Sequence, residues 1–232
     1  VPHKVKLNAK EEACLRAGIR EIYFKNIVRR NQVCYAPREG KLLIGGYGGL
    51  HYYRDTNPFV TDYSFHVVNS AACRKLQELG AARVTLSYEL NKQISELIAA
   101  YETNYGARPS LEMIVYGRAP LLFTKYCPLK KMEQCGRCKQ HQYELRDEYG
   151  SFPILSHEDC TTTILNGKFL NLLDEMPSIE GIEAFRLAFT TETPEEVSRV
   201  ISAAQRKLDG REQASLFRKD TDTRGHYNKE II

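Results

Sequence analysis

The sequence lacks the segments and motifs that identify several large classes of protein. It contains no recognisable signal peptide and no run of apolar residues long enough to cross a lipid bilayer. It also contains neither a G-x-S-x-G nor an H-E-x-x-H motif, the patterns of the α/β-hydrolases and of many zinc proteases. The sequence therefore predicts a protein that acts away from the membrane and uses neither of these catalytic motifs.

The chain also has no large excess of charge of one sign. Its 33 basic residues exceed its 29 acidic residues by four, which is a mild excess compared with proteins that coat nucleic acids. This charge permits a nucleic-acid partner but does not require one. With 232 residues, of which 42% are hydrophobic, the chain can bury one substantial core and form one or two domains.

Cysteine is present, but in an odd number that does not favour a framework of disulfides. Seven cysteines occur, and Cys14 and Cys73 interrupt helical apolar patterns. Cysteine in such a pattern behaves as a small hydrophobic residue, so we expect both in the core. Cys34 is the remaining cysteine outside the cluster described next. The odd count and the lack of a signal peptide favour a reducing compartment, and we expect the cytoplasm.

The other four cysteines form the strongest signal in the chain. Cys127, Cys135, Cys138 and Cys160 follow the spacing C-x7-C-x2-C-x21-C. Two thiolates separated by two residues can hold one ion while two more complete a tetrahedron, and four-cysteine iron-sulfur clusters use the same ligands. The spacing is neither that of a regular zinc ribbon nor that of a ferredoxin. It predicts a metal centre, either a 4Fe-4S cluster or zinc, and the alternative is a chance grouping of thiols.

The apolar pattern predicts alternating helices and strands. The predicted helices are 10–17, 70–79, 90–101, 167–174 and one that begins after Thr193, where Pro194 and Glu196 indicate a capping box. The predicted strands are 21–27, 63–68, 83–87, 111–116 and 184–189, with a hairpin formed by 143–147 and 152–155. Residues 41–53 contain four glycines, but they precede aromatic, strand-like residues, so we expect a glycine-broken segment that does not bind phosphate.

Strands that alternate with helices imply a parallel sheet with right-handed crossovers. The sequence predicts an α/β fold, a partial or TIM-like (β/α) barrel with an inserted Cys-rich β-hairpin, because about five or six strands are found where a complete barrel has eight. The expected organisation is a barrel-like domain over residues 1–208, with the metal loop at about 118–162, and a polar C-terminal segment over 209–232.

Several segments together resemble the peptidase U32 family, whose members are also described as collagenase-like proteases. They are V-T-L-S-Y-E-L from Val84, E-M-I-V-Y-G-R-A-P-L-L from Glu112, the C-G-R-C pair, Cys160 after a hairpin, and the terminal T-R-G-H-Y-N-K. The resemblance covers nearly the whole chain and fits best the C-terminal part of longer members. It therefore implies a missing N-terminal domain or partner subunit.

What this resemblance implies for function leaves three alternatives open. Better-understood relatives are iron-sulfur proteins that support 5-hydroxylation of pyrimidines in tRNA or rRNA, with prephenate implicated, or hydroxylation of the ubiquinone ring. The four cysteines would then be counterparts of the cluster ligands, and RNA would be a partner. The family label implies a metal-dependent peptidase instead. The third alternative is a non-catalytic binding module with a structural zinc.

Further polar residues are candidates for substrate binding. Arg118 directly follows a predicted strand, where barrel enzymes hold their substrates, and a guanidinium binds carboxylate or phosphate in a bidentate fork. The alternative for Arg118 is a structural ion pair with Glu112 or Glu89, and Glu89 is itself a candidate. His157 is a candidate either to donate a hydrogen bond to a metal-binding cysteine or to bind the metal itself, whereas His66 is expected in the core.

The C-terminal segment carries the remaining candidates, Arg224 and His226, together with Tyr227 and Lys229 around Gly225. Termini are usually solvated, but this mixture of residues is typical of a contact surface. We therefore expect the segment to pack near the cysteine loop. Arg118, Arg224 and Lys229 would then form a site for an RNA phosphate or a carboxylate.

Overall fold

The computed structural model describes most of the chain. The described residues are 22–24, 40–90, 94–132, 136, 138, 142–157, 160–211 and 214–228. The predicted helix at 10–17, Cys14, Cys34, Cys135 and Lys229 lie outside them.

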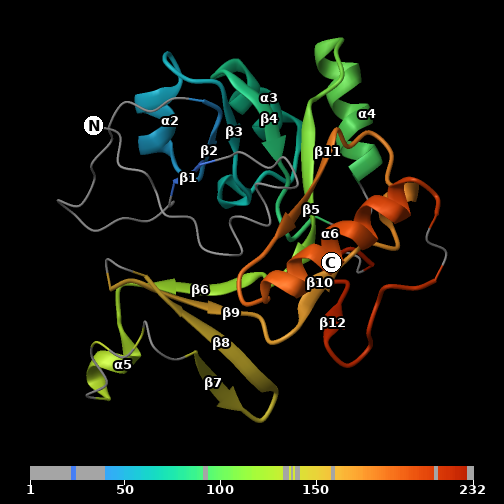
Figure 1. The fold of residues 1–232 in the computed structure, drawn as a ribbon. Coiled ribbons are helices and arrows are strands. Elements are labelled where there is room, and N and C mark those ends of the chain that lie inside the picture. The colour runs from blue at the N-terminus through green and yellow to red at the C-terminus, as the bar shows by residue number, and fades with distance from the viewer. Residues whose placement is uncertain are drawn as a thin grey trace.

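A mainly parallel main sheet forms the centre of the molecule (Figure 1). Its eight strands are β1 (Ile22–Phe24), β2 (Leu42–Ile44), β3 (Phe59–Thr61), β4 (Ala81–Thr85), β5 (Leu111–Gly117), β10 (Phe169–Asn171), β11 (Ala184–Ala188) and β12 (Asp222–Thr223). Strands β1 to β5 are parallel neighbours in chain order, and β11 is parallel to β5. The α/β class is confirmed, but over the described residues the sheet is open and does not close into a barrel.

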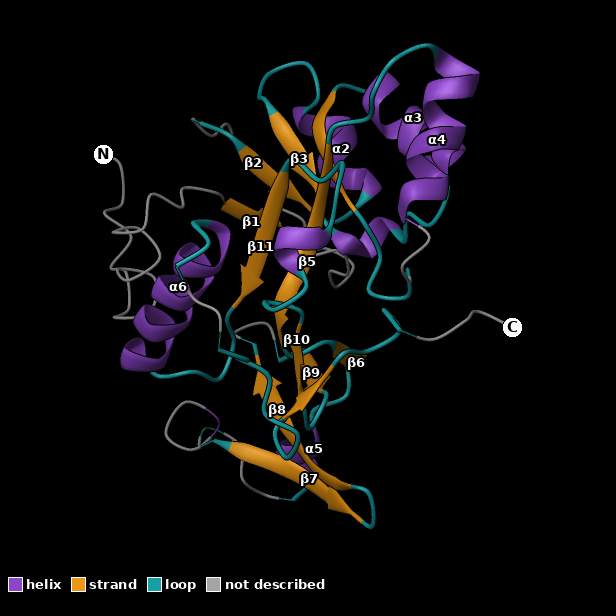
Figure 2. Cartoon of the chain, turned by 90° about the vertical axis from the view of Figure 1, so that its right-hand side faces the viewer, coloured by secondary structure: helices purple, strands orange, loops and turns teal. Residues whose placement is uncertain are grey.

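Helices cover both sides of the main sheet. They are α2 (Tyr47–Tyr53), α3 (Ser70–Glu78), α4 (Ile94–Tyr105) and α6 (Pro194–Leu208), with 3-10 turns η1 (Tyr63–Phe65) and η3 (Met176–Ser178). A short helix, α5 (Pro128–Lys131), follows β6 and lies away from the main sheet (Figure 1). Figure 2 shows α3 and α4 on one side of the main sheet and α6 on the other. The predicted capping box of α6 is present, because Thr193 and Glu196 bond reciprocally. Among the described residues, no helix is long and apolar enough to span a membrane.

Four further strands form a separate antiparallel sheet, here called the small sheet. They are β6 (Pro120–Thr124), β7 (Tyr143–Asp147), β8 (Gly150–Ser156) and β9 (Thr162–Leu165), in the order β6-β9-β8-β7. The predicted hairpin is confirmed as β7 and β8, whose turn is fixed because Asp147 Oδ1 accepts hydrogen bonds from the backbone N–H groups of Tyr149 and Gly150. Strands β6 and β9 were not predicted, and they connect the hairpin to the end of β5.

The core lies between the main sheet and its helices. Its largest fully buried side chains include Tyr53, Phe59, Leu42 and Ile44. Cys73 is also fully buried, as predicted, and burial raises the pKa of its thiol to about 12. A thiol in this environment stays protonated and packs as a small apolar side chain.

Three predicted elements differ from the structure. Residues 167–174, predicted as a helix, contain the strand β10, because a short buried apolar run has no periodicity that separates the two alternatives. Residues 63–68, predicted as a strand, form the turn η1 and a single bridge from Val67 to Leu86. The glycine-rich residues 41–53 form a strand followed by the helix α2, since Gly45 and Gly46 provide the turn between them.

The C-terminal segment joins the main sheet through β12, which is parallel to β10. Asp222 is buried there and accepts a hydrogen bond of 2.7 Å from Asn171 Nδ2. Asp174 accepts hydrogen bonds from Ser215 and from the backbone N–H of Leu216, and it forms an ion pair of 2.9 Å with Lys207 at the end of α6. Asp174 therefore links α6 and the C-terminal segment to the main sheet.

These contacts predict a pH-dependent stability. Burial alone would raise the pKa of Asp174, but the hydrogen bonds from Ser215 and Leu216 and the Lys207 ammonium lower it from 3.8 to about 2. A lowered folded-state pKa contributes stability above pH 3.8, which is lost as the pH falls toward 2. Urea unfolding should show Asp174→Asn less stable by about 2 kcal/mol at neutral pH, with the gap closing below pH 3.8. A gap that is constant with pH would contradict this assignment.

Candidate functional site

The strands that flank the four cysteines all meet at one end of the small sheet. The register pairs Thr124, the last residue of β6, with Thr162, the first of β9, and pairs Thr162 with Ser156, the last of β8. Tyr143, the first residue of β7, pairs near the same end of β8. We call this edge the cysteine end, and it is defined by residues 124, 143, 156 and 162.

Each cysteine belongs to a connection that begins or finishes at the cysteine end. Cys127 follows β6 and precedes α5, and Cys160 lies two residues before β9. Cys138 lies in the connection that leads into β7, as does Cys135, which is outside the described residues. Over the described residues alone, no group of three or more metal-binding side chains is present. The four-cysteine centre therefore stays a prediction, and its donor set of thiols fits a 4Fe-4S cluster or a structural zinc.

His157 stands directly beside the cysteine end. Its Nε2 lies 2.8 Å from Thr163 Oγ1, and its ring stacks on Phe123 at a centroid distance of 5.8 Å. The backbone N–H of Cys160 donates to the carbonyl of His157, and Cys160 adopts a φ of 58°. The His157 ring is thus held between β6 and β9, which is the position of a residue that supports a turn.

Arg118 is held by contacts within the protein. Its guanidinium donates hydrogen bonds to the backbone carbonyls of Asn166 and Gly167 and to Thr191 Oγ1. It also lies 3.8 Å above the ring centroid of Phe169. Burial lowers the pKa of Arg118. Arg118 therefore fastens the start of the small sheet to the main sheet. The alternative interpretation, an ion pair of Arg118 with Glu112 or Glu89, is not found among the described residues, where Glu112 pairs with Arg83 and Arg186.

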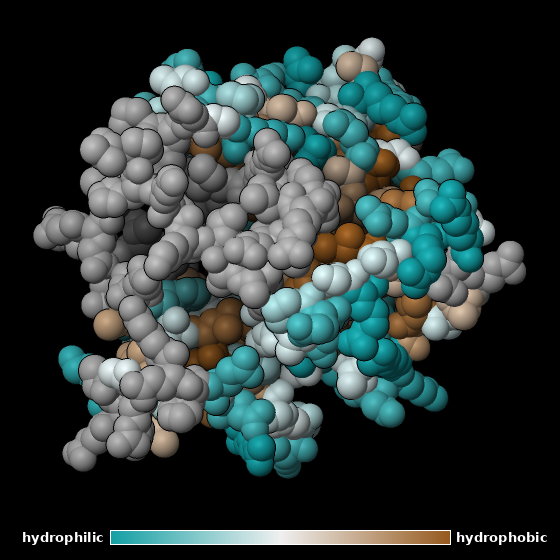
Figure 3. All heavy atoms as spheres, viewed as in Figure 1, coloured by the Kyte–Doolittle hydropathy of each residue, from teal (hydrophilic) through white to brown (hydrophobic). Residues whose placement is uncertain are grey.

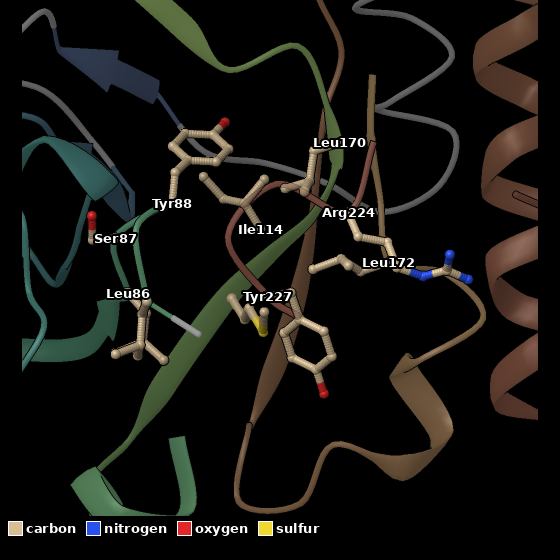
Figure 4. A pocket seen from close by; sticks show the side chains of 10 residues that line it. Leu86, Ser87, Tyr88, Ile114, Leu170, Leu172, Arg224 and Tyr227 are labelled. Atoms are coloured by element: carbon tan, nitrogen blue, oxygen red, sulfur yellow. The ribbon is translucent and has the colours of Figure 1, made fainter. Parts of the chain in front are cut away.

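The other predicted substrate-binding residues do not gather at one site. Glu89 is exposed in the turn after β4, and His226 is exposed in the C-terminal segment. Arg224 bonds to Glu175 and lies 4.2 Å above the ring of Phe217. Figure 4 shows its guanidinium directed away from Ser87 and Tyr88, which line the same narrow cavity of about 10 Å³. This space holds no more than about one water molecule.

His66 also differs from its prediction. It is exposed and adopts a φ of 51° at the end of η1, so it is not a core histidine. The predicted contact between the C-terminal segment and the cysteine loop is also not found among the residues of these two segments that the structure describes. Figure 1 shows β12 beside β10 and well apart from α5, and the contacts of Arg224 are with Glu175 and Phe217.

A buried ionic network that the sequence did not reveal crosses the main sheet. Glu112 on β5 accepts hydrogen bonds from Arg83 on β4, at 2.6 and 2.9 Å, and it forms an ion pair with Arg186 on β11. Arg186 also donates to Asp62 Oδ1 at 2.6 Å, and it donates to Thr85 Oγ1 at 2.8 Å. Two carboxylates and two guanidiniums thus neutralise one another across four strands.

The four charged side chains of this network are largely buried. The side chains of Asp62 and Glu112 are 2% and 3% exposed, and those of Arg83 and Arg186 are each 15% exposed. Burial raises the pKa of Asp62, although Arg186 opposes this effect. One signal in the sequence could have indicated this network, because Glu112 and Arg186 are charged residues within otherwise apolar predicted strands.

Comparison with known proteins adds one finding. The family model described as Peptidase family U32 matches residues 48–229. No curated protein and no solved structure matches the chain. The matched region runs from α2 to the C-terminal segment, so it includes the small sheet, all four clustered cysteines and the buried ionic network.

Proposed function

Because this chain belongs to the peptidase U32 family, we propose that it is the metal-bearing part of a protein that supports 5-hydroxylation of a pyrimidine in tRNA or rRNA. The observation that carries the proposal is the cysteine end, at which the strands that flank all four cysteines meet. Cys127, Cys135, Cys138 and Cys160 would hold the metal centre. The family assignment alone does not separate RNA hydroxylation from peptide cleavage. The chemistry of four thiolate ligands favours RNA hydroxylation.

An all-thiolate ligand set supports electron transfer better than hydrolysis. Catalytic zinc keeps an open coordination position and usually has histidine or carboxylate ligands, whereas four thiolates form a closed site. A 4Fe-4S cluster bound there would supply one-electron transfer. The same closed set would suit a structural zinc that joins the strands of the small sheet, which is the second candidate function, a binding module.

The surface beside the cysteine end has the residue types that bind RNA. Lys130 and Lys131 are exposed on α5, and Tyr126 is 54% exposed in the turn before it. Lysine ammonium groups bind phosphates without reading sequence, and an exposed tyrosine ring can stack on an unpaired base. In the proposed function, this surface positions the RNA next to the metal-binding connections.

The test is the mass of modified nucleosides. RNA from cells that lack the gene should contain one pyrimidine that is lighter by one oxygen atom, and the intact gene should restore the mass. A Lys130→Glu, Lys131→Glu variant should restore it less well than a Lys219→Glu variant, which changes an exposed lysine on the C-terminal segment. Unchanged nucleoside masses, together with metal-dependent cleavage of peptides by the purified protein, would overturn the proposal in favour of the peptidase.

A further inference from the structure

A cavity of about 340 Å³ lies between the end of β5, strand β10, helix α6 and the C-terminal segment. None of its lining residues belongs to the small sheet, so it is separate from the cysteine end. Its apolar walls come from Leu173, Val200, Ala203 and Leu216. Figure 3 shows the outer face of α6 as a hydrophilic band with hydrophobic side chains beside it, and the cavity lies under this helix. A cavity of this size accommodates a small organic molecule.

A buried carboxylate in this cavity lacks part of its hydrogen bonding. Glu192 is 4% exposed, and its Oε2 accepts a hydrogen bond of 2.6 Å from the backbone N–H of Thr190. Its Oε1 is buried and has no hydrogen-bond partner among the described residues. A buried acceptor without a donor costs about 1–3 kcal/mol, and more when it is charged. A ligand with a protonated amine would remove this cost.

The other buried carboxylate of the cavity is already satisfied. Asp222 Oδ2 accepts hydrogen bonds from Asn171 at 2.7 Å and from the backbone N–H of Arg218 at 2.8 Å. Its Oδ1 accepts a hydrogen bond from Thr221 at 2.8 Å. Asp222 therefore fixes the wall of the cavity, and Glu192 is the group that is left to bind a donor.

Guanidinium groups surround the mouth of the cavity. Arg199, Arg206 and Arg218 line it, and all three side chains are exposed. Arg199 reaches Glu196 at 3.9 Å, whereas the side chain of Arg218 has no ion-pair partner among the described residues. Exposed guanidiniums of this kind bind carboxylate or phosphate. The mouth thus favours an acidic group, while the interior favours an amine.

The aromatic residues of the cavity do not offer a free ring face. Phe169 is stacked on Tyr116 at a centroid distance of 5.6 Å, and the guanidinium of Arg118 covers it at 3.8 Å. Base recognition relies on stacking against such a face, so this wall does not favour a nucleotide. Flexible aliphatic walls and two separated charges favour a smaller molecule.

We propose that this cavity binds a small zwitterion. Its protonated amine contacts Glu192, its apolar body packs against Leu173, Val200 and Leu216, and its carboxylate or phosphate contacts the arginines at the mouth. The inference is independent of the proposed function, because it concerns a different set of residues and no step of RNA hydroxylation enters it.

The test uses three probes of the same skeleton, measured by calorimetry on the full chain. The probe 4-(aminomethyl)phenylacetate carries both charges, 4-methylphenylacetate lacks the amine, and 4-methylbenzylamine lacks the acid. We expect the affinity for the zwitterion to be at least about tenfold higher than the affinity for either analogue. Equal binding of all three probes, or no binding of the zwitterion at millimolar concentration, would overturn the proposal.

Variants locate the binding within the cavity. Glu192→Gln keeps the shape of the side chain. It should lower the affinity for the zwitterion about tenfold and leave the affinity for 4-methylphenylacetate unchanged. Arg218→Ala changes an exposed side chain, so the protein should stay folded. The variant should lower the affinity for both probes that carry a carboxylate, the zwitterion and 4-methylphenylacetate. Arg211→Ala, an exposed arginine that does not line the cavity, is the matched control. Unchanged affinity for the zwitterion in both the Glu192 and Arg218 variants would place the binding elsewhere and refute the proposal.

Discussion

Replacing Arg186 by methionine is expected to lower the free energy of unfolding by about 3–5 kcal/mol. Arg186 is the group that neutralises both Asp62 and Glu112, through bonds to each of them. Methionine fills a similar volume but leaves Asp62 without its ion pair and Glu112 with Arg83 alone. Removing one partner of a buried pair is more costly than the pair itself is stabilising, because the remaining charge stays desolvated.

The effect is measured by urea unfolding at neutral pH and compared with Arg146→Met. Arg146 lies on β7 with its side chain 78% exposed and pairs with Glu144, so its replacement should leave stability almost unchanged. A further variant, in which Asp62→Asn is combined with Arg186→Met, should recover part of the loss, since it removes the carboxylate that was left unpaired. Equal stabilities of Arg186→Met and the unchanged protein would show that the network does not hold β3, β5 and β11 together.

Local signals in the sequence predicted local structure well. The capping box at Thr193 places the start of α6, because both of its hydrogen bonds lie within four residues of the chain. The hairpin of β7 and β8 follows from the turn at Gly150, and β5 follows from an apolar run that is interrupted only by Glu112. The sequence pattern predicts a helix, hairpin or strand correctly when the residues that determine it lie within that same segment.

Structure that depends on distant partners was not predicted. Strand β10 is set by its pairing with β5 and β12, whereas its apolar run considered alone predicts a helix. Asp62 and Arg186 are separated by 124 positions, and their contact depends on the register of four strands. Arg118 is a candidate for substrate binding by its position after β5, but its contacts with the carbonyls of Asn166 and Gly167 involve residues 48 and 49 positions away, which the local pattern does not predict.

Cys135→Ser is expected to abolish metal binding by the purified protein. In the proposed centre Cys135 is one of four thiolate ligands, and a serine hydroxyl is a poor ligand for iron or zinc at neutral pH. Protein purified without oxygen should show a broad visible absorption if it holds an iron-sulfur cluster and should be colourless if it holds zinc. Metal analysis of the same samples then gives the amount bound, and the variant should lose both the metal and any colour.

The control is Cys73→Ala, because Cys73 is fully buried in the core and is separate from the cysteine end. This variant should keep its metal, whereas the Cys135→Ser variant should lose it and should also become sensitive to proteolysis in the small sheet. Binding of a structural metal is folding free energy, about 10 kcal/mol or more for zinc, so its loss should loosen the connections around β6 to β9 before the main sheet unfolds. Full metal content in Cys135→Ser would show that the four cysteines do not act together, since a closed tetrahedral site cannot lose a ligand without loss of affinity.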